Sequence, residues 1–152
     1  MSIQTSSMGD MLQAVRDLLK DSQSVQDIGA NVDLAEPVNE DPGRCPLIQL
    51  FPLRIGFPPR VLGIGVGYRA QNNEFVVQFQ QTHPNDGEAC LILLATLVQA
   101  GTSALLSDPS LKGTVQMLGD FDVDYLGITK TSDAIMQTAT LRAVGLTTVS
   151  GG

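Results

Sequence analysis

Three acidic side chains recur at every second position in the run Asp120–Tyr125 (DFDVDY), with an apolar residue after each. In an extended strand such residues point to one face, with about 7 Å between successive side chains. Magnesium is often held by one or two carboxylates together with substrate phosphates, so this face is a candidate metal site. An EF-hand loop is excluded, because Tyr125 stands where that loop needs glycine and Thr131 where it needs an acid. The competing interpretation is a strand whose acidic face meets solvent or a lumen through Asp120, Asp122 and Asp124.

A glycine-rich segment and a single histidine resemble parts of chemical motifs but depart from them in detail. The run Gly63–Gly67 (GIGVG) is rich in glycine like a phosphate-binding loop, yet the dinucleotide fingerprint needs glycine where Tyr68 stands. Glycine alternating with apolar residues instead suits a strand packed closely under another backbone. His83 is the only histidine, and the chain lacks the partners that a catalytic triad or a zinc site needs. We therefore expect no enzymatic activity and no metal or other cofactor, with His83 in the loop before a helix.

Two adjacent segments carry charge of opposite sign. Asp21 to Gly43 holds six acids and no base, and Arg44 to Asn73 holds four arginines and no acid. Such segments suit contact between one surface of a copy and a different surface of the next, which closes into a ring or runs on as a filament. The alternative is that both are solvated loops of uneven composition. The candidate ring-interface residues are Arg44, Arg54, Arg60, Arg69, Glu36, Glu40 and Asp41.

Composition narrows the class of partner. The chain of 152 residues has a net charge of −7, which disfavours sequence-independent binding to nucleic acid or to an anionic membrane. Only 16% of the residues are charged, below the roughly 25% of soluble domains, which leaves surface for protein partners. Cys45 and Cys90 lack metal-binding spacing and are expected to be buried free thiols. We expect no signal peptide, because the N-terminal residues (MSIQTSSMGDM) contain neither a basic nor an apolar stretch. We expect no membrane span, because the uncharged run Ala89–Ser107 contains several polar residues.

Helical periodicity predicts two helices. The first is amphipathic, follows a possible cap at Ser7 and ends near Asp21. The second begins at Asn85 or Asp86 and covers the run Cys90–Leu106, which is apolar nearly all round and is therefore expected to be buried.

Strand patterns surround the second helix. Before that helix, Pro52 is predicted to end one strand, and Gln71–Asn73 are predicted to form the turn of a hairpin between the next two strands. The order lacks regular alternation of strand and helix. It predicts an α+β fold, with a mainly antiparallel sheet and two helices packed on one face, in a single domain over residues 1–152. The predicted strands are 32–34, 46–51, 60–70, 74–81, 120–125 and 134–149.

This layout resembles that of bacteriophage tail terminator proteins, the lambda-type minor tail proteins and their neck-protein relatives. The resemblance covers most of the chain: the helix Gly9–Lys20, the strand Pro46–Leu50, the hairpin Arg60–Gln81 and a long, Thr-rich last strand. The strongest likeness is at the end of the second helix, Leu105–Gly113 (LLSDPSLKG). The family is held together by fold more than by particular residues.

The resemblance implies a structural virion protein of the tail or neck, assembled in the host cytoplasm. Six copies would form a ring on the head-proximal end of the tail tube, contacting the tail tube protein and the head-to-tail connector protein. DNA would pass through the lumen without specific binding, and Asp120, Asp122 and Asp124 would repel its phosphates. The family has no catalytic residues to assign. Two alternatives stay open: another phage neck or tail-completion protein, and a small metal-assisted enzyme that uses the strand containing Asp120.

Overall fold

The computed structural model describes residues 8–34, 44–57, 68–130 and 134–150, without the side chains of 68, 69 and 148–150. The described part contains three helices and five strands. In chain order they are α1 (Met8–Asp21), α2 (Gln23–Ile28), β1 (Asn31–Leu34), β2 (Leu47–Gly56), β3 (Tyr68–His83), α3 (Gly87–Leu106), β4 (Met117–Lys130) and β5 (Ile135–Ser150).

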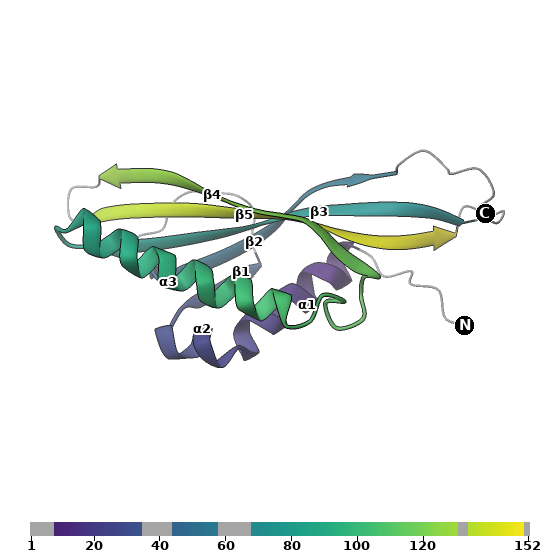
Figure 1. The fold of residues 1–152 in the computed structure, drawn as a ribbon, viewed down its shortest axis with the longest axis horizontal. Coiled ribbons are helices and arrows are strands. Elements are labelled where there is room, and N and C mark those ends of the chain that lie inside the picture. Colours follow the sequence, from purple (N-terminus) through teal and green to yellow (C-terminus); the bar gives the residue numbers. More distant parts are fainter. Residues whose placement is uncertain (1–7, 35–43, 58–67, 131–133, 151–152) are drawn as a thin grey trace.

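The strands form one sheet in the order β1-β2-β3-β5-β4. β1 pairs with β2 in parallel, and all other neighbouring strands are antiparallel. Figure 1 shows the three helices on one side of this twisted sheet, with nothing of the described chain covering the other side. The predicted α+β class and the mainly antiparallel sheet are confirmed. The face without helices is called the open face below.

The core lies between the sheet and the helices. β3 and β5 each contribute every second residue to this core, because side chains alternate between the two faces of a strand. α1 contributes positions with helical spacing, as its amphipathic pattern predicts. The largest fully buried side chains of this core are Phe75, Phe79, Met11, Leu19, Ile48, Leu50, Leu94, Leu97, Leu105 and Leu111.

A close approach fixes α3 on the sheet. A Cβ atom on Gly101 would lie 2.5 Å from Cε1 of Phe79 on β3, which is closer than real Cβ contacts come. Glycine therefore lets the helix backbone rest directly on the Phe79 ring. The helix starts at Asp86, whose carboxylate accepts hydrogen bonds from the backbone N–H groups of Glu88 and Ala89. The predicted choice between Asn85 and Asp86 is thus settled in favour of Asp86.

α2 is a short helix that the sequence analysis missed. Its first-turn N–H of Val25 donates to the hydroxyl of Ser22, and Gly29 ends it in the left-handed conformation with φ of 79°. Both are common helix-boundary signals, but the helix that they enclose is too short to show periodicity. The predicted count of two helices is corrected to three in the described part.

The predicted strand break at Pro52 is wrong. β2 continues to Gly56, and an irregularity between Pro52 and Arg54 shifts its register against β3. Proline is compatible with an edge strand, and β1 pairs only with Leu47–Leu50. In the described chain the second half of β2 therefore has a free outer edge.

The predicted hairpin turn at Gln71–Asn73 is also wrong. These residues lie inside β3 and pair with Gly145–Thr147 of β5. Gln71 and Asn73 are buried, and the Gln71 amide donates to the Asn73 side-chain oxygen over 2.6 Å. Pairing with β5 thus outweighed the turn preference of two asparagines.

Candidate functional site: a charged sheet face and an uncharged helix

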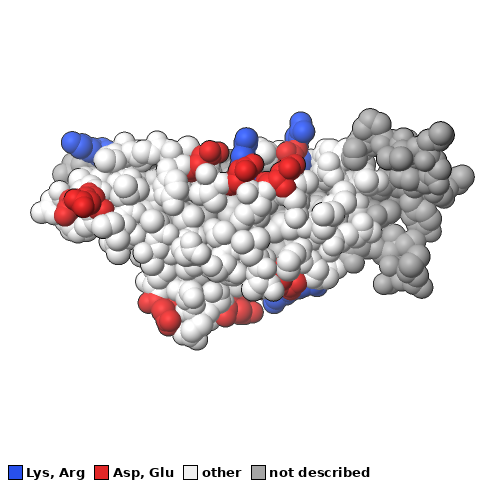
Figure 2. Space-filling model, in the orientation of Figure 1, with Lys and Arg blue, Asp and Glu red and all other residues white. Residues whose placement is uncertain are grey.

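Four charged residues form a stepped row across the open face of the sheet, made of two opposed pairs that are offset by two positions along β3 and β5. Arg54 of β2 opposes Glu74 of β3, and Arg142 of β5 opposes Asp122 of β4. Their sequence neighbours on β3, β5 and β4 pack into the core, so alternation along each strand points the charged side chains away from the helices. Figure 2 shows charged side chains of both signs gathered along the upper rim, on the open side of the sheet. The row alternates in sign from one strand to the next: plus, minus, plus, minus.

Arg54 stands at one end of this row. Its Nε donates to the carboxylate of Glu74, and 73% of its side chain remains accessible to solvent. An ion pair this exposed contributes about 0–1 kcal/mol to stability. Its larger effect is on the direction of the side chain, because it holds the largely exposed guanidinium on the open face.

The acids of β4 stand at the other end. Asp120, Asp122 and Asp124 are all exposed, whereas Phe121 and Val123 between them pack against the core. The predicted alternation of faces therefore holds within this run. Bulges between Gly119 and Asp122, and between Tyr125 and Gly127, interrupt the pairing of β4 with β5. Tyr125, which strict alternation would place on the same face as Phe121 and Val123, is 51% exposed next to the second bulge.

A shallow cleft of about 560 Å³ joins the two ends of the row. Arg54 and Glu74 line one side, and Asp120, Asp122 and Arg142 line the other. In the described part of the chain, no three His, Cys, Asp or Glu side chains converge as metal ligands do. The three aspartates of β4 spread along an edge instead of surrounding one point. The cleft is thus suited to complementary charged surface more than to a metal ion.

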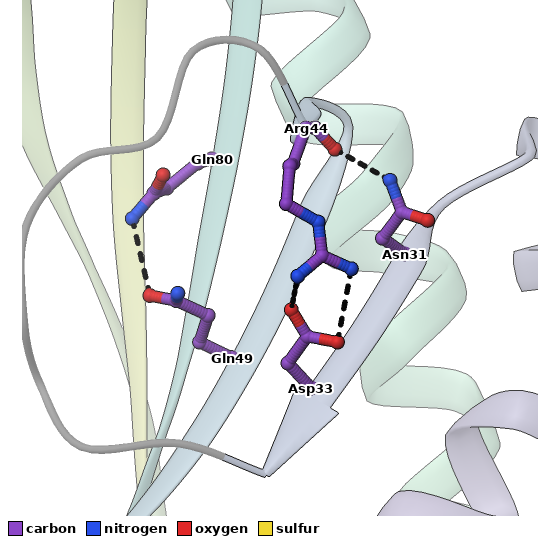
Figure 3. Close-up of polar contacts among 5 residues, drawn as sticks. All are labelled: Asn31, Asp33, Arg44, Gln49 and Gln80. Carbon is purple, nitrogen blue, oxygen red and sulfur yellow. Dashed lines mark hydrogen bonds and ion pairs between the residues drawn. The ribbon is translucent and has the colours of Figure 1, made fainter.

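Arg44 has partners within its own chain (Figure 3). Its guanidinium reaches the carboxylate of Asp33 on β1 through two hydrogen bonds, one of them 3.1 Å between Nη2 and Oδ1. The Asn31 amide donates to the Arg44 carbonyl over 2.7 Å. Beside this pair in the view, Gln80 donates to Gln49 between β3 and β2. The contacts of Arg44 connect β1 to the start of β2, so this arginine has a role in the fold besides the predicted interface.

The remaining predicted interface residues are not placed by the structure. Glu36, Glu40, Asp41 and Arg60 lie outside the described residues. Arg69 belongs to β3 and opposes Val149, but its side chain is not described. The GIGVG run also lies outside the described residues. The structure therefore brings together only Arg54, Asp120 and Asp122 of the predicted set, and it adds Glu74 and Arg142, which sequence reasoning missed.

The outward face of α3 is the second unusual surface. Glu88 is the only charged residue in the twenty residues of this helix. Ile92 is 60% exposed, and three leucines of α3 are exposed as well: Leu91, Leu93 and Leu106. In Figure 2 a wide area without charge occupies the middle of the view, where Figure 1 places α3 in front. The low charge of this region was visible in the sequence, but its exposure was not.

A groove runs between α3 and α2. It measures about 640 Å³, and its lining is mainly apolar or small. The α3 side includes Ile92, Ala95 and Ala100, and the α2 side includes Ile28. By length and composition α3 could cross a membrane, but its inner face packs on the sheet as a core helix does. The prediction of a buried helix is correct for that inner face alone.

The remaining reactive groups have ordinary structural positions. His83 is the last residue of β3 and pairs with Ile135, so its predicted place in the loop before α3 is wrong by one element. Its Nδ1 accepts hydrogen bonds from the backbone N–H groups of Asn85 and Asp86, which do lie in that loop. Both cysteines are free thiols. Cys90 is buried 3.3 Å from the Gln81 carbonyl oxygen, and this burial raises the pKa of its thiol. Cys45 is only half-buried, so the expectation of two buried thiols is correct for Cys90 alone.

Comparison with known proteins supplies no function for this chain, so the surfaces described above are the basis for proposing one. No protein-family model matches the chain, and no curated protein matches it.

Proposed function

We propose that this protein is a structural subunit that assembles into a ring, and within that class a tail terminator that caps a phage tail tube. The observation that carries the proposal is the outward face of α3, which has exposed isoleucine and leucine side chains and almost no charge. Helices that cover a sheet in water normally place charged residues outward. An outward face without them is typical of a surface that another protein covers.

The amount of apolar surface is consistent with an interface. Fully burying one leucine or isoleucine stabilises a complex by about 1.5–3 kcal/mol, and four such side chains of α3 are roughly half exposed. Covering them together would stabilise an interface by several kcal/mol before the entropic cost of association. Small residues in the groove with α2 would allow a partner backbone to approach closely.

The choice of a tail terminator rests on the resemblance in layout. In that role, one face of the ring would bind the end of the tail tube and stop its growth. The other face would meet the head-to-tail connector. Of the exposed acids of β4, Asp124 is available to face the passing DNA, whose phosphates it would repel without binding a particular sequence. No step in this function requires a catalytic residue or a cofactor.

Light scattering on the purified protein over a range of concentrations tests the proposal, together with negative-stain electron microscopy. We expect a mass near six subunits, or a shift toward it as concentration rises, and closed rings in the images. Rings that bind the ends of tail tubes would support the terminator role in particular. Dimers, open filaments, or a strict monomer at every concentration would contradict ring assembly.

A further inference from the structure

The sheet has two different free edges in the described chain. β4 forms one edge along its whole length, because it pairs only with β5. At the opposite edge β1 covers Leu47–Leu50 and leaves Phe51–Gly56 of β2 without a neighbouring strand. Free edges readily pair with another chain, and a protein that keeps them needs a way to control which chain.

The two free edges lie at the same level of the sheet. Arg54 opposes Glu74, Glu74 opposes Val144, and Val144 opposes Gly119 of β4. Asp120 directly follows Gly119, and Asp122 lies within the same short stretch. A line drawn across the strands from Arg54 therefore reaches β4 at Gly119, directly before Asp120 and three residues before Asp122. β2 and β4 also run in opposite directions, since three antiparallel pairings separate them.

The charge of the row differs between the two edges. It begins with the positive Arg54 on β2 and ends with the negative Asp122 on β4. Placing two β4 edges together would bring acids against acids, and placing two β2 edges together would bring Arg54 against Arg54. Only contact between a β4 edge and a β2 edge continues the alternation of sign. Opposite charges on directly opposed strands stabilise a pair by about 0.2–1 kcal/mol, and like charges destabilise it.

We propose that the β4 edge of one copy lies against the β2 edge of the next, so that Arg54 faces Asp120 and Asp122 of its neighbour. This inference rests on the proposed ring and identifies its interface and its partner, a second copy of the same chain. The contact joins two different surfaces, so repetition closes a ring or extends a filament. Exposed apolar side chains on both edges, among them Leu53, Ile55 and Met117, are available to pack around the charges.

The bulges in β4 shape this contact. Asp120 has a positive φ of 47° at the first bulge, and Gly127 has a φ of 92° at the second. Bulges interrupt a ladder and bend the strand, which is a common protection of sheet edges against indiscriminate pairing. A long main-chain ladder with any exposed strand is therefore disfavoured at β4. Recognition then depends on the side chains beside the bulge, which are the acids that Arg54 would meet.

Charge reversal tests the contact with light scattering and electron microscopy. We expect Arg54→Glu and Asp122→Arg each to raise the concentration of half-assembly about tenfold, because each places like charges across the interface. The double variant should assemble nearly like the wild-type protein. An equimolar mixture of the two single variants should also assemble, since each supplies the edge that the other needs in an even-membered ring.

The double variant separates this interface from effects within one chain. In it the introduced glutamate would stand against Glu74 and the introduced arginine against Arg142, so repulsion inside the chain makes the double variant the least stable of the three. A double variant that assembles no better than the single variants overturns the proposed contact. The control is Lys20→Glu on α1, an exposed site with the same charge change as Arg54→Glu, which should assemble normally. If either reversal prevents folding, as judged by circular dichroism, Arg54→Gln and Asp122→Asn should shift assembly in the same direction by a smaller factor.

The outcome for the wild-type protein distinguishes the two proposals. If the wild-type protein forms rings and both reversal variants form them at the same concentration, the edge contact is overturned and ring assembly stands. A wild-type protein that stays monomeric at every concentration would overturn both.

Discussion

α1 and α3 cover the same face of the same sheet, yet their outward faces differ in charge. α1 carries five charged residues among fourteen, and α3 carries one among twenty. Their inner faces are alike, since both place fully buried leucines in one core. Only their outer faces differ: α1 exposes acids, Lys20 and Gln13, whereas α3 exposes isoleucine, leucine, alanine, threonine, serine and Gln99, with Glu88 as its one charge.

This difference separates the requirements of folding from those of assembly. An inner face must be apolar for the sheet to be covered, and both helices meet that requirement. An outer face that always contacts water normally carries charged residues. The outer face of α1 has them and that of α3 has almost none, although both helices belong to the same chain. Under the proposed function, the departure reflects a protein partner that covers α3 and not the general low charge of the chain.

The largest expected effects should be equal in the two helices. Leu19→Ala on α1 and Leu94→Ala on α3 each empty a fully buried site and should lower the free energy of unfolding by about 2–5 kcal/mol. Urea denaturation at one fixed protein concentration measures this. Leu93→Ala is the matched control, because its leucine is 45% exposed on the same helix and should cost far less than Leu94→Ala. Similar losses at Leu93 and Leu94 would contradict the division of α3 into an inner and an outer face.

The outer faces should then differ in assembly. Ile92→Lys on α3 and Gln13→Lys on α1 each add one cation at an exposed site, four residues from an acid on the same helix. Both changes should therefore leave the helix itself nearly as stable as before. We expect Ile92→Lys to raise the concentration of half-assembly about tenfold, equivalent to about 1.4 kcal/mol, because the interface must bury a charge.

Gln13→Lys should assemble like the wild-type protein, and light scattering compares the two variants directly. Equal behaviour of both would mean that the outer face of α3 meets solvent as that of α1 does. The proposed function would then lose the observation on which it rests.

The sequence predicted those parts of the fold that depend on local pattern. The amphipathic spacing of α1, the cap before α3 and the alternation in Phe121–Asp124 all depend on neighbours within a few residues. The errors arose where distant pairing decides the structure. Asn73 lies in a strand because β5 pairs with it, and Pro52 is tolerated because it stands on an edge of the sheet.

The candidate site could be predicted only in part for the same reason. Arg54 and Asp122 stand out within charged segments, but Glu74 and Arg142 are single charges in otherwise unremarkable strands. Only the registers of three strand pairs place these four residues in one row. The sequence also showed that the second helix lacks charge, without showing which side of it the sheet leaves exposed. That distinction is what turns low charge into a candidate interface.

The smallest expected effect concerns how the two helices end. The last turn of α1 contains Lys20, whereas that of α3 contains no base and is followed by Asp108. The Asp108 carboxylate accepts hydrogen bonds from the Ser110 hydroxyl over 2.7 Å and from the Lys112 N–H over 3.0 Å. These bonds, chiefly that from Ser110, lower the pKa of Asp108 below its ordinary value of 3.8.

Because the folded pKa is the lower one, this stabilisation is present above pH 3.8 and is lost as pH falls through the folded pKa. Asp108→Asn should lower the melting temperature slightly at pH 7 and reduce its fall in acid below pH 3.8. Thermal melts followed by circular dichroism at a series of pH values measure both changes. Ser110→Ala removes the main cause of the lowered pKa and should weaken the acid dependence in the same way, while leaving the carboxylate in place. An acid dependence unchanged in both variants would show that the end of α3 is held by the burial of Leu111 alone, and not by the turn around Asp108.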